Sequence, residues 1–348
     1  MNATIPTPLP SQARRIFVWH QGALGDVLMA GPALLALAQH YRQASMTLVG
    51  NAEYLNLFKT ILPLAAIWSS QRAIWLDLYQ TSEPLDCTLA ARLASFDLAV
   101  IFSPQEDPAF RHRFHLAGVP SVIWLPSFPQ QIRQPIRRLQ EKHLQSLGMT
   151  QALPPLDLAL PAAEVRAARE ILADQSHSQN LWVALAPGSG HPRKNWPLAN
   201  YLELARLLED RWQAEVWWLL GPAEIDVAAQ LSALRPADHR QHLLTNQPLA
   251  IVAAFLKNYH LYVGNDSGLT HLAAAVAGPK TAAIFGPSDP VIWAPPGIVP
   301  ITSSLPCAPC TSGRTISCPE ARCLANLTVA TVSRALAPLL PPVSQAQS

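Results

Sequence analysis

The stretch "GNDSGLTHLAAAVAG", residues 264–278, decides the fold prediction because the sequence changes character at one point in it. An apolar run that ends at Val263 stops at a glycine, and a carboxylate, a hydroxyl, a second glycine and a histidine follow. After His271 the chain continues with small apolar residues at helical spacing. The pattern predicts a buried strand that leads into a helix, with polar side chains gathered at the junction.

The same kind of junction occurs three more times. Polar turns follow the apolar runs 15–20, 181–187 and 215–221, as "HQGALGDV" (20–27), "APGSGHPRKNWP" (186–197) and "LLGPAEID" (219–226). Other β-rich runs, at 46–50, 98–102, 121–125, 261–265 and 281–286, alternate with amphipathic helical patterns such as 198–211. Repeated strand–helix–strand units predict an α/β protein whose parallel sheets are covered by helices on both sides.

The length of 348 residues allows two domains. A segment with three prolines, residues 151–165, separates two halves of similar size. We therefore expect one doubly wound domain over 13–155 and a second over 165–325. Such sheets bind ligands at the carboxyl ends of their strands, so the prediction is a site in a central cleft between the two domains.

Composition excludes several classes of protein. Only 14% of the residues are charged and the formal net charge is +2, which argues against a nucleic-acid partner. No uninterrupted apolar run reaches the length of about 18 residues that a transmembrane helix needs. Arg14 and Arg15 precede an apolar stretch, but His20 and Asp26 interrupt it, so we do not expect a signal peptide. The chain is expected to be cytoplasmic.

Each polar junction has a structural interpretation beside a functional one. Asp26 could simply cap a helix, and Pro32 predicts a fresh helix over 32–41 after a short turn. Lys194 could be a solvated side chain or a point charge for a phosphate, and Glu224 could cap a helix or bind sugar hydroxyls. Capping does not explain Asp266, Ser267 and His271 together, whereas a helix start there would bind an anion such as a diphosphate. Four such junctions favour a ligand site.

At these residues the sequence resembles glycosyltransferase family 9, the heptosyltransferases of the lipopolysaccharide inner core. The resemblance rests on "GALGDVLMAGPAL", "PGSGHPRKNWP", "LLGPAEID", "GNDSGLTHLAAAVAGPKTAAIFGPSDP" and "PCAPC…CPEARCLANLT", in that order. It implies the GT-B fold, with acceptor binding in the first domain and nucleotide-sugar binding in the second. It also implies that a last helix, about 327–340, packs back on the first domain.

The resemblance assigns roles to individual residues. Asp26 matches the candidate general base, and Gly25 beside it is assigned to the acceptor side. The positions that match donor and phosphate contacts are Ser189, Gly190, Lys194, Glu224, Asp266, Ser267, Gly268, Thr270 and His271. The chain departs from the family where it has Gly188 and Gly190, because hydroxyl or basic residues are frequent there.

The resemblance implies an inverting sugar transfer that requires no metal ion. The donor is expected to be a nucleoside diphosphate sugar, ADP-heptose, and the acceptor a lipopolysaccharide core or related glycolipid. Two other hypotheses stay open: a GT-B-like enzyme such as a sugar-nucleotide epimerase, and a non-catalytic nucleotide-sugar-binding protein. Basic segments raise the hypothesis of an acceptor surface at the inner face of the cytoplasmic membrane, through Arg133, Arg137 and Arg138, but an ordinary solvated helix face is the preferred interpretation of them.

Four cysteines near the end of the chain form a separate pattern. Cys307, Cys310, Cys318 and Cys323 have the spacing C-x2-C-x7-C-x4-C. Four thiolates this close in sequence can surround Zn²⁺, so a structural zinc site is a candidate. Four reduced thiols or a redox-labile cluster are the alternatives. No catalytic role follows from the pattern.

Overall fold

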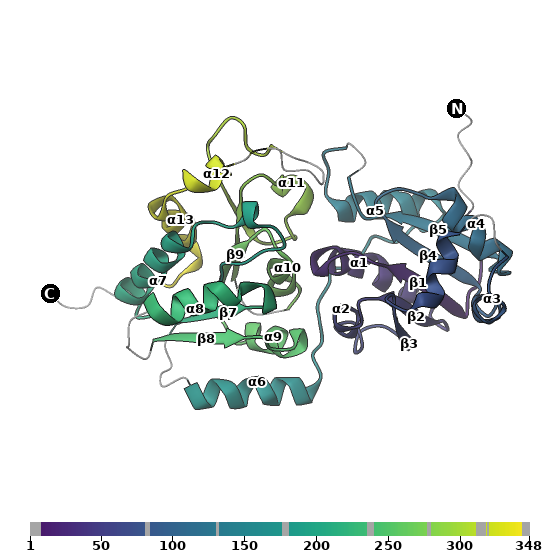
Figure 1. The fold of residues 1–348 in the computed structure, drawn as a ribbon, viewed down its shortest axis with the longest axis horizontal. Helices are drawn as coiled ribbons and strands as arrows, with labels where there is room; N and C mark the ends of the chain where they lie inside the picture. The colour runs from purple at the N-terminus through teal and green to yellow at the C-terminus, as the bar shows by residue number, and fades with distance from the viewer. Residues whose placement is uncertain are drawn as a thin grey trace. The chain divides into compact units, whose positions relative to one another are not determined.

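The computed structural model describes residues 8–80, 84–129, 132–175, 181–234, 240–276, 280–310, 318 and 320–342. The chain divides into two compact units, Met1–Leu158 and Ala159–Ser348. The division lies inside the proline-rich segment 151–165. In Figure 1 the first unit runs from purple to blue and the second from teal to yellow.

The first unit is built on a five-stranded parallel sheet with the order β3-β2-β1-β4-β5. Its strands are β1 (Arg15–His20), β2 (Ser45–Gly50), β3 (Leu64–Ser69), β4 (Leu98–Ser103) and β5 (Ser121–Pro126). Its helices are α1 (Leu24–His40), α2 (Ala52–Asn56), η1 (Ala73–Tyr79), α3 (Cys87–Leu93), α4 (Pro108–Leu116) and α5 (Ile136–Ser146). Phe17 and Trp19 of β1 pack on one face of the sheet with Trp75 and Phe114, which joins the central strand to η1 and α4.

The second unit is built on a six-stranded parallel sheet with the order β11-β10-β9-β6-β7-β8. Its strands are β6 (Trp182–Ala186), β7 (Glu215–Leu220), β8 (Gln241–Thr245), β9 (Leu261–Asn265), β10 (Lys280–Phe285) and β11 (Val299–Thr302). The longer helices are α6 (Ala162–Gln175), α7 (Leu198–Trp212), α8 (Ile225–Leu234), α9 (Leu249–Leu256), α10 (Gly268–Ala275) and α13 (Val329–Leu336). Short helical turns are η2 (Pro192–Lys194), η3 (Pro222–Glu224), α11 (Pro290–Trp293), α12 (Arg322–Ala325) and η4 (Ala337–Leu339).

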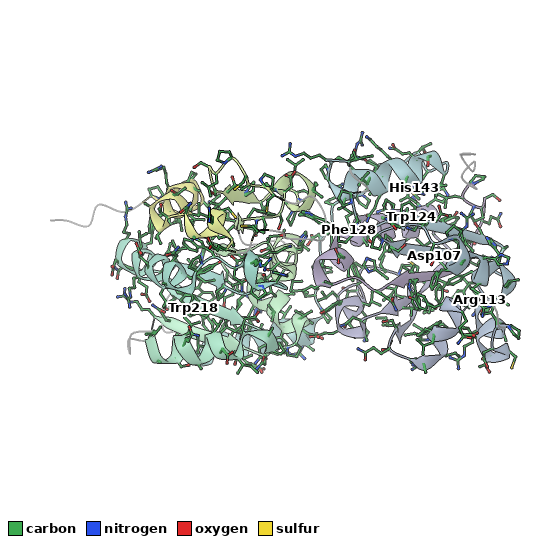
Figure 2. The ribbon with its side chains drawn as sticks, turned by 45° about the horizontal axis from the view of Figure 1, so that its top comes forward. Asp107, Arg113, Trp124, Phe128, His143 and Trp218 are labelled. Atoms are coloured by element: carbon green, nitrogen blue, oxygen red, sulfur yellow. The ribbon has the colours of Figure 1, made fainter. Side chains whose placement is uncertain are left out.

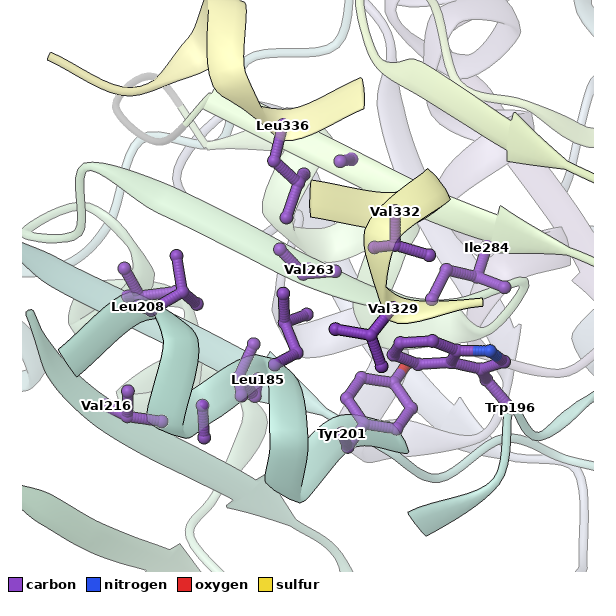
Figure 3. Close-up of a cluster of buried hydrophobic side chains, with 14 of the residues drawn as sticks. Leu185, Trp196, Tyr201, Leu208, Val216, Val263, Ile284, Val329, Val332 and Leu336 are labelled. Atoms are coloured by element: carbon purple, nitrogen blue, oxygen red, sulfur yellow. The ribbon is translucent and has the colours of Figure 1, made fainter. Parts of the chain in front are cut away.

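Side chains alternate across this second sheet, as the period of a strand requires. Trp218 belongs to the core beneath α7, α8 and α13, whereas its neighbour Trp217 stacks with His242 and packs against Phe255 of α9. Figure 3 shows the first of these cores, where Leu185 and Val263 from the strands lie among side chains of α7 and α13. Both faces are therefore apolar, which is typical of central parallel strands.

The last helix corrects a prediction. Val332 and Leu336 of α13 are buried in the core of the second unit, and α13 packs against α7 (Figure 3). The indole Nε1 of Trp196 also donates a 2.8 Å hydrogen bond to the carbonyl oxygen of Leu327, just before this helix. The expected return of residues 327–340 to the first domain is wrong, because their apolar stripe covers the second sheet.

The α/β fold class, with two doubly wound parallel sheets, is confirmed. All eight expected strands are present, and three further strands, β3, β8 and β11, were not expected. The helix break at Pro32 is wrong: α1 continues through it, and Gly31 beside it packs closely against Leu156 and Phe58. In the part of the chain that the structure describes, no helix is long and apolar enough to cross a membrane.

The strand order sets the place of a ligand site in each unit. The chain winds outward from β1 in one direction and from β4 in the other, and β6 and β9 form the equivalent pair in the second sheet. In doubly wound sheets ligands bind outside the carboxyl ends of the strands at this switch point. The turns after β1, β6 and β9 carry most of the predicted site residues, and Glu224 follows the neighbouring strand β7.

Candidate active site

The segment that follows β6, residues 187–196, is a compact turn that we call the β6 loop. Ser189 lies near its start, and its hydroxyl is 2.5 Å from Oδ1 of Asn195 and 2.8 Å from the carbonyl oxygen of His191. Gly190 is exposed and has no neighbour within 4 Å of where a Cβ would lie. The loop ends at Trp196, which is 1% exposed. Ser189 therefore stiffens the loop from inside, while Gly190 leaves its outer surface open.

Lys194 and Asp266 form the charged centre of the site. The Lys194 Nζ lies 2.6 Å from Oδ2 of Asp266, although 72 residues separate them in sequence. The Asp266 side chain is 7% exposed and that of Lys194 is 30% exposed. The ammonium thus keeps one side toward solvent while the carboxylate fixes it at the switch point, where it can also meet an anionic ligand.

The start of α10 lies directly after this pair. Ser267 is the residue before the helix, and it makes no side-chain capping hydrogen bond to the helix within the described chain. The first N–H groups of a helix lack intrahelical partners and carry partial positive charge. Gly268 opens α10 without a side chain that could screen them. This helix start and Lys194 can therefore act on the same negative charge.

His271, one turn into α10, is buried and electrically neutral at pH 7. Burial, with a further contribution from the nearby Lys194 charge, lowers the pKa of His271 to about 4, against the opposing effect of Asp266. A neutral ring can donate or accept one hydrogen bond at this point without adding charge. The positive charge offered to a ligand here comes from Lys194 and the helix.

Thr270 has a structural role that differs from the predicted one. Its side chain is 1% exposed, and its hydroxyl donates a 2.6 Å hydrogen bond to the carbonyl oxygen of Asn265. The Tyr262 hydroxyl lies 3.2 Å from the same oxygen atom of Thr270. This side chain joins the end of β9 to α10, and the predicted donor contact of Thr270 stays a prediction.

Glu224 lies beside the β6 loop, at the end of η3. Its Oε2 accepts a 2.8 Å hydrogen bond from the backbone N–H of Gly221, so the capping role is present. Its Oε1 occupies the space that a side chain on Gly188 would need. Gly188 is therefore required by the approach of Glu224, which gives a physical reason for this chain's departure from the hydroxyl-containing family pattern.

Asn265 was not among the predicted site residues, although it lies within the quoted stretch. It is fully buried, and its side chain bonds to the β6 loop and to Tyr201. The sequence signal that could have identified Asn265 is a polar amide side chain at the end of an apolar strand, directly before Asp266.

In the first unit, Asp26 lies in the first turn of α1. Its Oδ2 accepts a 3.0 Å hydrogen bond from the backbone N–H of Ala23, so it sits three residues after the N-cap rather than at it. His20, at the end of β1, accepts a 3.1 Å hydrogen bond from the N–H of Gly22 through Nδ1. A Cβ on Gly22 would lie 2.6 Å from both the Asp26 Cβ and the His20 Cε1. The glycine thus lets His20 and Asp26 approach each other.

The buried ring of His20 predicts acid sensitivity. Burial lowers the pKa of His20 from 6.5 to about 4. The unfolded chain takes up this proton at a higher pH than the folded chain does, so stability present above about pH 6.5 is lost as the pH falls toward 4. In His20→Asn, whose amide oxygen can still accept from Gly22, we expect the loss of unfolding free energy between about pH 7 and 4.5 to shrink by roughly 2 kcal/mol.

Urea unfolding of both proteins at the two pH values measures this difference. An equal loss in the two proteins would show that His20 does not contribute to the acid sensitivity. His271 has the same direction of shift and adds to the total slope in both proteins.

A family model described as glycosyltransferase family 9 (heptosyltransferase) matches residues 129–320, more than half of the chain. The chain belongs to glycosyltransferase family 9. Lipopolysaccharide heptosyltransferase 1 of Pseudomonas aeruginosa is 36% identical over 145 residues, which cover 41% of this chain and 39% of that protein. The match thus spans about two fifths of the length of this curated relative.

Two solved structures show the same fold over nearly the whole chain. A glycosyltransferase of family 9 from Veillonella parvula has a TM-score of 0.76 at 16% identity, covering 96% of this chain and 99% of its own. The Escherichia coli ADP-heptose lipopolysaccharide heptosyltransferase II has a TM-score of 0.70 at 19% identity, covering 93% and 98%. The family 9 chain therefore has the GT-B fold, with its two Rossmann-like units.

The basic residues predicted for the acceptor side of this family 9 protein differ in their surroundings. Arg137 donates to the carbonyl oxygen of Leu153, and Arg138 pairs with Glu141, whose pKa it lowers. Arg133 is exposed, and Gly25 is half-buried in the first turn of α1. Arg137 and Arg138 are thus engaged within the chain, which favours the structural interpretation of the basic helix.

The opposite side of α5 is fixed to the sheet. Gln140 is fully buried and donates a 3.1 Å hydrogen bond to the carbonyl oxygen of Pro126. His143 lies edge-on against Trp124 of β5, with ring centroids 5.4 Å apart (Figure 2). The buried side of α5 therefore packs on the sheet of the first unit and has a structural role.

The four cysteines lie on both sides of segment 311–317, which is outside the described residues. Cys307 and Cys310 are exposed and Cys323 is buried; all are free thiols. Burial raises the pKa of Cys310 and Cys323, and the charge of Cys318 raises both further. Among the residues that the structure describes, no group of three or more His, Cys, Asp or Glu has the arrangement of a metal site. The structural zinc site stays a prediction.

Metal analysis tests that prediction. If the four thiolates bind zinc, the purified chain is expected to contain one equivalent of Zn²⁺ for each chain, and Cys310→Ser is expected to lose most of it. Cys87→Ser, a change in the first unit, serves as the control and should keep the metal. An equal metal content in wild type and Cys310→Ser would contradict the prediction.

Proposed function

We propose that the chain is an inverting glycosyltransferase that moves heptose from ADP-heptose to a lipopolysaccharide core or a related glycolipid. Membership of family 9, and similarity to a lipopolysaccharide heptosyltransferase and to an ADP-heptose heptosyltransferase, support the substrate class. The observation that carries the proposal is the Lys194–Asp266 pair beside the start of α10, at the switch point of the second sheet.

In this proposal the second unit binds the donor. Lys194 and the first N–H groups of α10 hold the diphosphate and stabilise the negative charge that grows on it as the sugar leaves. Ser267, Gly268 and His271 line the same helix start, and Glu224 offers its carboxylate to donor hydroxyls. Because the ammonium and the helix supply positive charge, the proposed reaction needs no metal ion.

The first unit supplies the base. The acceptor oxygen attacks the anomeric carbon while its proton passes to the Asp26 carboxylate. The new bond from oxygen to carbon forms as the bond from that carbon to the diphosphate breaks, and the electron pair leaves with ADP. A single displacement of this kind inverts the configuration of the sugar.

A coupled assay of ADP release from ADP-heptose tests the proposal. Release is expected only when a lipopolysaccharide-core acceptor is present, and nuclear magnetic resonance is expected to show an inverted anomeric centre in the product. If the chain bound ADP tightly but formed no ADP from ADP-heptose with any acceptor, it would be a nucleotide-sugar-binding protein. Conversion of the donor to a stereoisomer without acceptor would indicate an epimerase.

The proposed acceptor also implies a peripheral contact with the inner face of the cytoplasmic membrane. Arg133 and its neighbours would approach anionic headgroups, where each basic residue contributes about 1 kcal/mol. Alanine at Arg133, Arg137 and Arg138 is expected to lower cosedimentation with anionic vesicles, and neutral vesicles are the control. Unchanged cosedimentation would remove the membrane contact from the proposal while leaving the transfer reaction.

A further inference from the structure

A single buried amide, that of Asn265, closes the β6 loop at both ends. Its nitrogen donates a 2.7 Å hydrogen bond to the carbonyl oxygen of Pro187 and lies 3.4 Å from that of Gly188, at the start of the loop. Its oxygen accepts a 3.0 Å hydrogen bond from the backbone N–H of Trp196, at the end of the loop. The Tyr201 hydroxyl donates a further 3.1 Å hydrogen bond to the same oxygen.

The chemistry of the partners requires an amide at this position. A backbone N–H only donates and a carbonyl oxygen only accepts, so the side chain between Trp196 and Pro187 must accept on one side and donate on the other. Asn265 is fully buried, and Trp196 and Tyr201 are 1% and 0% exposed, so water cannot replace a lost partner at little cost. An ionised aspartate would turn a negative oxygen toward the carbonyl of Pro187, and leucine would leave both ends of the loop without their partners.

The hydrogen bonds of the Asn265 side chain to Pro187 and Trp196, which we call the clamp, are connected to the Lys194–Asp266 pair by short stretches of backbone. Lys194 lies two residues before Trp196, and Asp266 follows Asn265 directly. The carbonyl oxygen of Asn265 also accepts from Thr270, which fixes the same residue to α10. The position of the Asn265 side chain therefore sets where the Lys194 ammonium stands relative to Asp266 and to the helix start.

We propose that Asn265 is a positioning residue for the donor site. It fixes the position of the β6 loop and of Lys194 relative to α10 without contacting the donor itself. The inference rests on the proposed function for the identity of the ligand. It deepens that function by assigning the preorganisation of the diphosphate site to one buried side chain. A displacement of about 1 Å in such a site can lower activity about 10²-fold.

The test compares Asn265→Leu and Asn265→Asp with wild type, and uses Gln241→Leu as the matched control. Gln241 is a buried amide of the same unit that bonds to Trp218 and Glu209; it is the first residue of β8, whereas the site lies at the carboxyl ends of the strands. Calorimetry with ADP, and the KM values for donor and acceptor, are the readouts. Asn265→Leu is expected to weaken ADP binding and raise the donor KM by about 10- to 100-fold, with the acceptor KM unchanged. Gln241→Leu is expected to lower the melting temperature alone.

The aspartate variant adds a readout that a general loss of stability would not give. Burial raises the pKa of the introduced carboxyl, and a protonated carboxyl can donate to Pro187 while it accepts from Trp196. Of its neighbours, Tyr201 stays neutral because burial raises its pKa well above 10, and Asp266 is paired with Lys194. Asn265→Asp is expected to bind ADP nearly as wild type at about pH 5.5 and to approach the leucine variant at about pH 8.

Hydrogen–deuterium exchange without ligand separates the inference from the proposed function. In Asn265→Leu, amide exchange is expected to rise across 188–195 and to stay at wild-type levels in the first unit. Unchanged donor KM, ADP affinity and loop exchange in both variants would overturn the inference. If wild type itself bound no ADP, the proposed function would fail and the donor role of Asn265 with it, and the exchange data would still decide whether the clamp exists.

Discussion

Replacing Asp26 by asparagine is expected to lower kcat by about 10²- to 10⁴-fold, the range that general base catalysis contributes. An asparagine oxygen can still accept from the N–H of Ala23, so the start of α1 and the melting temperature should be preserved. The amide cannot take up the acceptor proton. Since donor binding is assigned to the second unit, the affinity for ADP and the donor KM are expected to stay at wild-type values.

Asp107→Asn is the matched control for this change. Asp107 caps α4 in the same unit by accepting hydrogen bonds from Ala109 and Phe110, and it has no assigned role in the reaction (Figure 2). Steady-state kinetics of the two variants should therefore differ in kcat alone. Full activity in Asp26→Asn would remove the assigned base and favour the interpretation of Asp26 as a structural capping residue.

Replacing Lys194 by methionine is expected to have the second large effect, on both binding and turnover. The change removes the point charge that faces the diphosphate and leaves the Asp266 carboxylate, 7% exposed, without its 2.6 Å partner. That carboxylate then repels the donor. We expect ADP affinity and kcat each to fall by about 10²-fold, the size of effect seen when one charge-stabilising donor is lost from an active site.

A double variant separates the two causes. In Lys194→Met with Asp266→Asn, the repulsion is absent, so part of the ADP affinity is expected to return while kcat stays low. Lys257→Met, at an exposed lysine at the end of α9 in the same unit, is the control for loss of a positive charge. Equal ADP affinity in wild type and Lys194→Met would show that the diphosphate does not bind at this pair.

The sequence predicted the inner strands well and the outer ones poorly, for a physical reason. β1, β4, β6 and β9 lie inside the sheets, so they appear as continuous apolar runs with clear ends. The strands that were missed, β3, β8 and β11, are all at sheet edges. β3 is largely half-exposed, and β11 contains Pro300, which an edge strand tolerates because one side has no partner.

The candidate site shows a similar division. Spacing and residue type located the polar turns after β6, β7 and β9, and the fold brings Lys194 and Asp266 into contact there. Sequence could not separate side chains that face a ligand from those that face inward. Thr270 and Asn265 lie on either side of Asp266 in the sequence, and threonine and asparagine are common in ligand sites. Both side chains are nevertheless buried, and each donates a hydrogen bond to a backbone carbonyl oxygen. The direction of a side chain depends on neighbours distant in sequence, such as Pro187 and Tyr201.

The central claim, that the carboxyl ends of β6, β7 and β9 form a nucleoside diphosphate site, is tested most directly by hydrogen–deuterium exchange with and without ADP. We expect slower exchange on ADP binding in 187–196, 221–224 and 265–271, and no comparable change in the turns at the opposite ends of these strands. Protection confined to other segments, or no protection at ADP concentrations that saturate binding, would contradict it.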